Sequence, residues 1–165
     1  MEKLHHQVQG EIDADLQSSL ADPVFVSDVW QVSLLSDETL NDSDKTFVVP
    51  ADTEYQILWI WVEFSATATV GDRQIVIEVQ DTGADVIAQW ARAGVVQAAN
   101  LVRFYLFAPA VADLTGFRDL DFLSTPIPPT SFLQAGDILR IYDNNAVDAA
   151  ADDMIIQMQI GSRAV

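Results

Sequence analysis

Cysteine is absent from the 165 residues of this chain. Disulfide bonds and thiolate catalysis are therefore excluded, and stability must come from packing or from assembly. Histidine is almost absent, because its only two copies are the adjacent His5 and His6. Neighbouring histidines in a polar terminal segment are more typical of solvent exposure than of a metal site. No Gly-x-Ser-x-Gly elbow, phosphate-binding loop or Rossmann glycine pattern is present. We therefore expect a protein that is not an enzyme.

Basic residues are scarce: Lys and Arg total 8 against 25 Asp and Glu, which gives a net charge of -17. Such a chain repels nucleic acid phosphates and anionic lipid headgroups, so we expect neither a nucleic acid partner nor a membrane partner. No apolar run reaches the length of a transmembrane helix, and the first ten residues lack the apolar core of a signal peptide. We expect a protein made in the cytoplasm. Its acidity suits solubility at high copy number, or docking on a basic or cation-bridged surface.

The longest run rich in β-branched and aromatic residues spans positions 54–64 and predicts a central strand. Alternation along an extended strand predicts two apolar faces, one with Tyr55, Ile57, Trp59 and Trp61 and the other with Leu58, Ile60, Val62 and Phe64. Because neither face is polar, both must be covered. We expect one cover to be an opposing sheet, and the other to be the N-terminal segment or a neighbouring subunit.

Further segments with strand patterns are separated by turn residues, without any βαβ alternation. They span residues 24–35 (a strand pair or one long bent strand), 46–50, 73–79, 86–90, 101–107, 132–142 with a turn at Gly136, and 154–160. Residues 110–129 predict a loop packed along the surface. Roughly eight strands indicate an all-β fold, an antiparallel two-sheet β-sandwich. A jelly roll is the first topology we consider. An immunoglobulin-like sandwich is the second, disfavoured because no cysteine pair surrounds a buried tryptophan.

Residues 1–22 differ from the remainder because they are polar and acidic, with apolar residues at roughly helical spacing until Asp22-Pro23 interrupts them. The apolar positions are Leu4, Val8, Ile12, Leu16 and Leu20. We divide the chain into an N-terminal arm or short helix over 1–22 and a jelly-roll-like sandwich domain over 23–165. A frayed terminus and an arm that reaches a neighbour explain the segment equally well.

The tripeptide Asp81-Thr82-Gly83, followed by Ala84 and Asp85, resembles the catalytic turn of retroviral-type aspartic proteases. In a dimer, that resemblance implies two carboxylates that share one proton. The likeness ends there, because Gln80 stands where that family has an apolar residue and no glycine-rich flap follows. A hairpin turn uses the same residue types and is the favoured interpretation.

An acidic loop before the last strand supplies oxygen atoms at a density that suits Ca²⁺. The candidate ligands are Asp143, Asn145, Asp148 and Asp152, with Asn144 and Asp153 beside them. The EF-hand pattern is not met, because its central glycine and closing glutamate are missing. Loop solvation or N-capping by aspartate is the favoured interpretation, and we expect no metal and no cofactor.

Aromatic side chains on the predicted strands suggest a stacking platform for a sugar. They are Trp59, Trp61, Trp90, Tyr105 and Tyr142. Aromatic residues in strands more often belong to a core or an interface, and alternation already assigns most of these to such positions.

Three stretches, at 91–109, 119–129 and 141–154, resemble small virion structural proteins of tailed bacteriophages. The likeness spans roughly residues 47–160. Separately, Leu133-Gln-Ala-Gly-Asp-Ile-Leu139 is similar to the turn and strand signature of trimeric jelly rolls and fibre heads.

The resemblance implies a capsid decoration, or cement, protein on the outer surface of the virion. Its partner would be the major capsid protein, and its assembly a homotrimer. Trp59, Trp61, Tyr55, Leu4 and Val8 are the expected interface residues. A head-fibre or tail-fibre module that binds a host glycan is the alternative within structural proteins.

Overall fold

The computed structural model describes residues 29–165, and this part of the chain is all-β, with strands and no helix. Its strands are β1 (Gln31–Asp37), β2 (Asp44–Val48), β3 (Thr53–Ser65), β4 (Ile75–Gln80), β5 (Val86–Arg92), β6 (Val102–Pro109), β7 (Leu114–Thr115), β8 (Phe122–Ile127), β9 (Phe132–Leu133), β10 (Ile138–Asp143) and β11 (Asp153–Ala164). The predicted all-β class is confirmed. The N-terminal arm predicted over 1–22, with Leu4 and Val8, lies outside the described residues.

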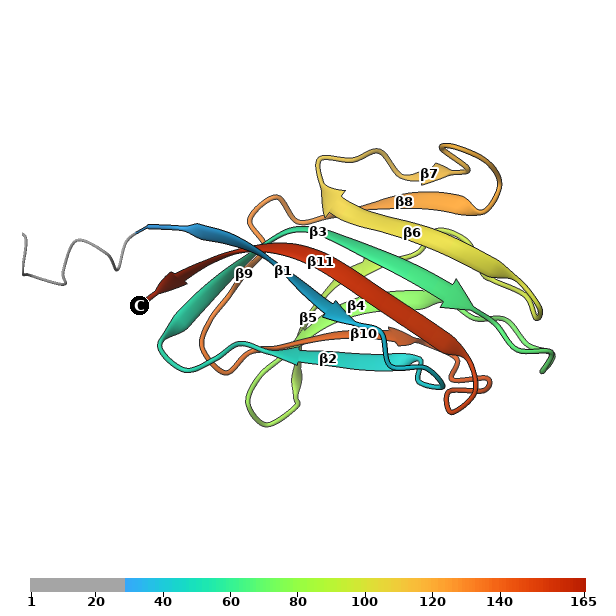
Figure 1. Cartoon of the computed structure of the whole chain (residues 1–165), viewed down its shortest axis with the longest axis horizontal. Coiled ribbons are helices and arrows are strands. Elements are labelled where there is room, and N and C mark those ends of the chain that lie inside the picture. The colour runs from blue at the N-terminus through green and yellow to red at the C-terminus, as the bar shows by residue number, and fades with distance from the viewer. Residues whose placement is uncertain (1–28) are drawn as a thin grey trace, which may run out of the picture.

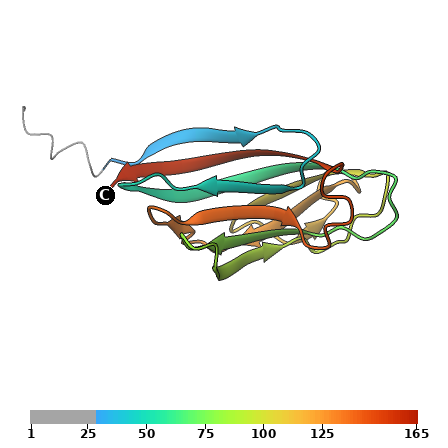
Figure 2. The ribbon, with the colours of Figure 1, turned by 90° about the horizontal axis from the view of Figure 1, so that it is seen from below.

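The strands form two sheets that pack face to face (Figures 1 and 2). Sheet A has the order β1-β11-β3-β6-β8-β7, with β9 paired to one end of β3, and sheet B has the order β2-β10-β4-β5. Along the chain, the sheet changes between β1 and β2, β2 and β3, β3 and β4, β5 and β6, β9 and β10, and β10 and β11. The predicted two-sheet sandwich is confirmed, with most neighbouring strands antiparallel.

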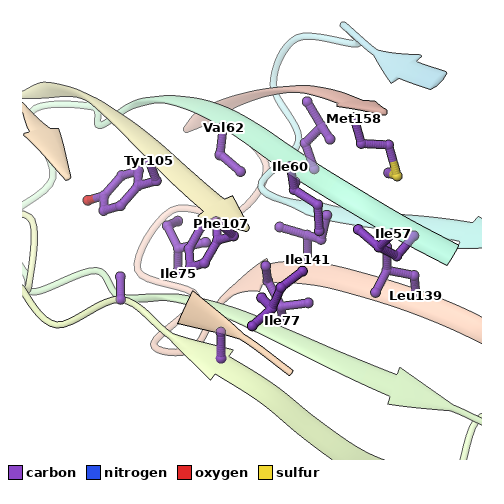
Figure 3. Packing of buried hydrophobic residues seen from close by; sticks show 14 of the residues in the cluster. Ile57, Ile60, Val62, Ile75, Ile77, Tyr105, Phe107, Leu139, Ile141 and Met158 are labelled. Atoms are coloured by element: carbon purple, nitrogen blue, oxygen red, sulfur yellow. The ribbon is translucent and has the colours of Figure 1, made fainter. Parts of the chain in front are cut away.

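The core lies between the sheets, where side chains from the two inner faces point toward each other (Figure 3). Sheet A contributes Ile57, Ile60, Val62 and Met158, and sheet B contributes Ile75, Ile77, Leu139 and Ile141. Each of these side chains is at most 1% exposed. Burying a side chain of this size stabilises the fold by about 1.5–3 kcal/mol. The predicted inward positions of Met154, Ile156, Met158 and Ile160 in the last strand are all buried.

A β-bulge in β3 makes the predicted alternation wrong at one end of the strand. Trp59 pairs with Gln159 whereas Ile57 pairs with Ile160, so Leu58 is the extra residue. A bulge of one residue reverses the face on which all earlier side chains lie. Ile57 therefore joins Ile60 in the core, and Tyr55 packs against the same core. Trp59 and Trp61 lie on the outer face of sheet A, without Tyr55 or Ile57.

The segment predicted as a loop over 110–129 contains two strands, and β8 pairs with β6 in parallel. This is an exception to the expected antiparallel arrangement. The loop prediction rested on the apolar residues of this segment, with the prolines stiffening its exit, and proline is normally excluded from central strands. In the structure Pro126 lies opposite Ala108 of β6, while β7 pairs only with Leu123 and Ser124. At Pro126, β8 therefore has no partner strand on the side away from β6. The N–H that proline lacks is not needed for strand pairing on that side.

Candidate functional site

The outer face of sheet A carries a row of large apolar side chains, which we call the tryptophan face: Leu34, Trp59, Trp61, Phe104, Leu106 and Phe122. Register brings them together from four strands. Trp61 of β3 lies between Gln157 of β11 and Leu106 of β6. Trp59 lies beside Gln159, which in turn lies beside Leu34 of β1. Residues distant in sequence thus become neighbours through strand pairing.

Two adjoining hollows open on this face. One has a volume of about 420 Å³ and is lined by Trp59, Trp61, Leu106 and Gln157. The other, of about 230 Å³, reaches toward β1 and shares Trp59 and Gln157 as its lining. The Trp59 indole N–H donates a hydrogen bond to Oε1 of Gln159 at 3.0 Å, which holds the ring in place. The Trp59 ring, which borders both hollows, is therefore fixed in orientation.

Stacked aromatic rings continue the face beyond Trp61. The centroid of the Phe104 ring lies 5.9 Å from that of Trp61 and 4.6 Å from that of Phe122. Phe117 meets Phe122 edge to face at 5.9 Å, and the Arg118 guanidinium lies 5.0 Å from the Phe122 centroid. Rings that support one another in this way provide a broad apolar surface that loses little conformational entropy on binding.

At the other end of sheet A, Trp30 lies over Gly161 on the same outer face. A Cβ added at Gly161 would stand 3.2 Å from Cε3 of Trp30, so the indole lies almost on the backbone. Trp30 also packs beside Phe132 at 5.9 Å, and the Arg163 guanidinium lies 4.9 Å from its centroid. The Trp30 indole therefore covers this end of the outer face of sheet A.

An ion pair closes this end of the face. Nε of Arg163 donates to Oε2 of Glu54 at 2.6 Å, and Gln134 donates to the other oxygen. The hydrogen bond from Arg163, then that from Gln134, holds the pKa of the Glu54 carboxyl below its ordinary value. Glu54 thus stays charged and paired at neutral pH.

The two outer faces of the sandwich differ in chemistry. On sheet A, Val32 and Leu34 of β1 are 62% and 67% exposed, and Leu114, Phe117 and Leu120 beside β8 are exposed as well. On sheet B, Arg140 binds Asp44 at 2.6 Å and Glu78 at 3.1 Å, and Tyr142 donates to Glu78 at 3.0 Å. Charged pairs thus lie on sheet B, although Val48 of β2 and Val86 and Ile87 of β5 are also exposed there, whereas the tryptophan face is lined by large apolar side chains. Large exposed apolar patches mark interaction sites in soluble proteins.

The predicted calcium candidates are occupied by contacts within the protein. Asp152 is fully buried and forms a two-pronged ion pair with Arg73, at 2.6 Å to Nε and 3.1 Å to Nη2. It also accepts the Thr67 amide N–H at 2.7 Å. Asp148 accepts the hydroxyls of Thr67 and Thr69, both at 2.8 Å. The hydroxyl of Thr69, then that of Thr67, lowers the pKa of Asp148 below its ordinary value.

The remaining two calcium candidates hold the loop between β10 and β11 together. Asp143 accepts the amide N–H groups of Gln74 and Asn145, and Asn145 donates its side-chain amide to the Asp72 carbonyl at 2.6 Å. Within residues 29–165, no group of three or more His, Cys, Asp or Glu side chains is arranged to hold a metal ion. The structure gives these side chains a structural use, as capping groups and as an ion-pair partner.

Asp81 lies at the turn of the β4–β5 hairpin, as the hairpin prediction requires. Its Oδ1 accepts the amide N–H groups of Gly83 and Asp85 at 2.8 and 3.0 Å, and its own N–H donates to the Asp85 carbonyl. The carboxylate therefore stabilises its own turn. Thr82 lies against the turn at Gly136, before β10, because a Cβ added at Gly136 would stand 2.6 Å from Cγ2 of Thr82.

The five aromatic residues considered for a sugar platform do not share a surface. Trp90 packs against the core, and the buried Tyr105 donates its hydroxyl to Gln97 at 2.9 Å. Burial raises the pKa of Tyr105 to about 12. Tyr142 lies on the outer face of sheet B, where the Arg140 guanidinium is 4.1 Å from its ring centroid. Only Trp59 and Trp61 of this set lie on one face.

Sequence reasoning identified Trp59 and Trp61 but missed Leu34, Phe104, Leu106 and Phe122. Alternation in the 101–107 segment carries a signal for Phe104 and Leu106, because they lie two residues apart. Their position beside Trp61 depends on the β3–β6 register, which sequence patterns do not specify. No protein-family model and no curated protein matches the chain significantly. No helix long and apolar enough to cross a membrane occurs in the described part of the chain.

Proposed function

We propose that this chain is a bacteriophage structural protein of the capsid decoration type, which binds the outer surface of the head and reinforces it. The proposal combines the sequence resemblance to tailed-phage virion proteins with one structural observation. That observation is the tryptophan face, an apolar surface with stacked rings and two hollows on an otherwise acidic molecule. A surface of this kind suits binding to protein, and its partners would be the major capsid protein and further copies of the chain.

We further propose a jelly-roll topology, and the strand pairing supports it. Four pairs are nested in sequence: β4 with β5, β3 with β6, β2 with β10, and β1 with β11. Strand pairs nested in this way form one long hairpin. Two further pairings, β11 with β3 and β10 with β4, fold this hairpin into two sheets. Two sheets made from a rolled hairpin are the arrangement of double Greek-key folds.

The proposed assembly is a homotrimer in which Trp59 and Trp61 lie between protomers. A stable interface between copies needs to bury at least about 1,000 Å² in total. Stacked aromatic rings near the centre of an interface are the residues on which binding energy concentrates. Tyr55, which the sequence predicted as a third interface residue of this face, packs against the core instead and is not expected to contact a neighbour.

Solution mass is the first test. Size-exclusion chromatography with light scattering should give three times 18.2 kDa for the wild-type chain. The Trp61→Ala variant should give the monomer mass with an unchanged β-type circular dichroism spectrum. Intact assembly combined with lower thermal stability of Trp61→Ala would place this ring in a core and end the interface proposal.

Capsid binding is the second test. Heads prepared from the encoding phage without this protein should bind it saturably in a co-sedimentation assay, and should then resist heat or low ionic strength better. A glycan array and a peptide substrate screen at acid pH should give no signal. Saturable glycan binding would favour the fibre alternative, and cleavage abolished by Asp81→Asn would favour the protease.

A further inference from the structure

We propose that an extended segment of the capsid protein pairs with β1 as a further strand of sheet A. It would bind the side of β1 that faces away from β11, which we call the β1 edge. This inference rests on the capsid-binding role proposed above and names the surface at which the partner binds. The partner segment has alternating side chains, with a lysine or arginine at the end that meets Asp37 and Glu38.

The β1 edge is a long, regular strand border without a partner strand in the described part of the chain. β1 is the outermost strand of sheet A, and it pairs with β11 over seven successive residues without a register shift (Figure 2). Alternate residues of a strand direct their N–H and C=O groups to opposite sides, so about three or four residues of β1 direct theirs away from β11. A row of such groups is a template for a further strand.

The other strand borders of the sandwich carry features that protect an edge from pairing. β7 and β9 have only two residues each, and β8 carries Pro126 where β7 does not cover it. β5 has two register shifts opposite β4. β2 directs the charged side chain of Lys45 inward, where it is fully buried. β1 has none of these features, and its sequence contains no proline, glycine, lysine or arginine.

Hollows that suit side chains lie beside β1 near both of its ends. The hollow of about 230 Å³ described above is lined by Leu34 and Ser36. A third hollow, of about 270 Å³, is lined by Gln31 and by its register partner Ser162. Ser36 and Gln31 are five positions apart, so their side chains lie on opposite faces of the sheet. An added strand alternates in the same way, so two of its side chains can enter the two hollows, which is how strand addition gains specificity.

Charge at one end of the β1 edge selects the chemistry of the partner. Nζ of the fully buried Lys45 lies 3.1 Å from Asp37 and 3.4 Å from Asp42. Glu38 is exposed and makes no ion pair within residues 29–165. Three carboxylates beside one ammonium leave this end negative, so a lysine or arginine of the partner complements it. A second copy is disfavoured, because β1 has no basic residue to offer and each copy carries a net charge of -17.

Amide hydrogen exchange of the free, full-length protein, followed by NMR at residue resolution, is the first test. We expect protection to alternate along β1, because the amides bonded to β11 exchange slowly and those of the β1 edge exchange quickly. Protection of every β1 amide would show that the edge is already paired and would overturn the inference. Such protection would be independent of concentration for a segment of the same chain, and would rise with concentration for a second copy.

Proline substitutions test the edge itself. Val32 and Ser33 are consecutive, so the N–H of one bonds to β11 and the N–H of the other belongs to the β1 edge. Of Val32→Pro and Ser33→Pro, the one that alters the edge keeps the β11 pairing, and its thermal unfolding should stay closer to that of the wild type. Val32→Ala and Ser33→Ala are the matched controls, because they shorten the same side chains and keep the N–H groups.

Co-sedimentation with heads that lack this protein measures the effect on binding. We expect the edge proline variant to bind at least about tenfold more weakly than the wild type, because it loses a main-chain hydrogen bond and its ring obstructs the added strand. The alanine controls should stay within about twofold. Glu38→Lys should bind about fivefold more weakly. Asp85→Lys makes the same charge change at the exposed β4–β5 turn of sheet B and should bind like the wild type.

The failure of this inference is distinguishable from the failure of the proposed function. A folded edge proline variant that binds heads as tightly as the wild type would overturn the inference, while the capsid-binding role stands. If both proline variants unfold, equal binding of Glu38→Lys and the wild type would overturn it instead. A wild-type chain that does not bind heads would end the proposed function and this inference with it.

Discussion

Arg73 is the largest fully buried side chain of the described residues. Its guanidinium binds Asp152 through two nitrogens and donates to the carbonyls of Gly71 and Thr69. A buried charge keeps its place only when such partners replace water. The pair thus ties the connection between β3 and β4 to the loop between β10 and β11.

Removal of this guanidinium should be strongly destabilising. We expect Arg73→Leu to lower the free energy of unfolding by about 3–5 kcal/mol, because Asp152 would remain buried without its countercharge. Urea denaturation followed by tryptophan fluorescence measures the loss. The exposed Arg118→Ala is the control, with an expected change of at most about 0.5 kcal/mol. Equal effects of the two substitutions would show that water reaches the Asp152 carboxylate.

Asp148 makes a second prediction at the residue scale, concerning pH. The hydroxyls of Thr69 and Thr67 lower its pKa in the folded protein. A carboxyl whose pKa is lowered by folding stabilises the fold above its unfolded pKa, and this stabilisation is lost as the pH falls through the folded pKa. The pKa of Asp37 is lowered as well. Burial raises it, but hydrogen bonds from the Thr39 amide and from Lys45 together lower it by more.

We therefore expect the free energy of unfolding to be nearly constant from pH 7 to about pH 5 and to fall below about pH 4, near the ordinary pKa of aspartate. Asp148→Asn keeps an acceptor oxygen for the two threonine hydroxyls but cannot titrate. Its decline on acidification should be shallower than that of the wild type in urea titrations at each pH. Parallel declines would assign the acid sensitivity to other carboxyls.

Among the elements, the turn before β10 depends on Gly136. Its φ of +88° lies in the region that L side chains rarely adopt, and its N–H donates to the Val49 carbonyl at 3.0 Å. A Cβ at this position would also stand 2.6 Å from Cγ2 of Thr82, in the neighbouring hairpin turn. Backbone strain and a steric clash therefore act together at one residue.

A positive φ alone costs about 1–2 kcal/mol for an L residue. Gly136→Ala should lower the free energy of unfolding by more than this amount. The double variant Gly136→Ala with Thr82→Ser lacks the Cγ2 methyl group. It should regain the part of the loss that the clash causes, while the backbone strain remains. Thermal unfolding of the two single variants and the double variant separates the terms. No recovery in the double variant would mean that the Thr82 turn moves aside without cost.

Sequence patterns predicted most of these elements because turn chemistry and alternation are local. The Asp81–Asp85 turn and the inward residues of β11 follow directly from such signals. Two other features did not, because they depend on partners distant in sequence. The bulge at Leu58 is visible only in the pairing with β11, and the strand character of Phe122–Ile127 depends on β6.

In the candidate site, too, local patterns predict some residues, whereas others depend on partners distant in sequence. Trp59 and Trp61 were assigned to an interface because an apolar alternating strand needs a cover on both sides. Phe104 joins them through the antiparallel register of β3 with β6, and Phe122 through the parallel register of β6 with β8. No local sequence pattern encodes either register. Arg73 and Asp152 are 79 positions apart, so no local pattern predicts their ion pair. The sequence instead presents Asp152 as a metal candidate.

For the whole molecule, charge opposes the proposed trimer, whereas burial of the tryptophan face would favour it. Each copy carries a net charge of -17, so copies that approach one another repel at low ionic strength. The Debye length shrinks from about 30 Å at 0.01 M salt to about 10 Å at 0.1 M, which screens this repulsion. Burial of apolar surface is not weakened by moderate salt.

Association of the wild-type chain should therefore strengthen with salt. We expect the concentration at which half of the protein is trimeric to fall at least several-fold between 10 mM and 300 mM NaCl, in sedimentation equilibrium runs at pH 7.5. Leu34→Lys adds positive charge on the apolar face and separates the two contributions: it should stay monomeric at both salt concentrations if apolar contact at this face drives assembly. Dissociation of the wild type at high salt would instead mean that ion pairs, and not the tryptophan face, hold the copies together.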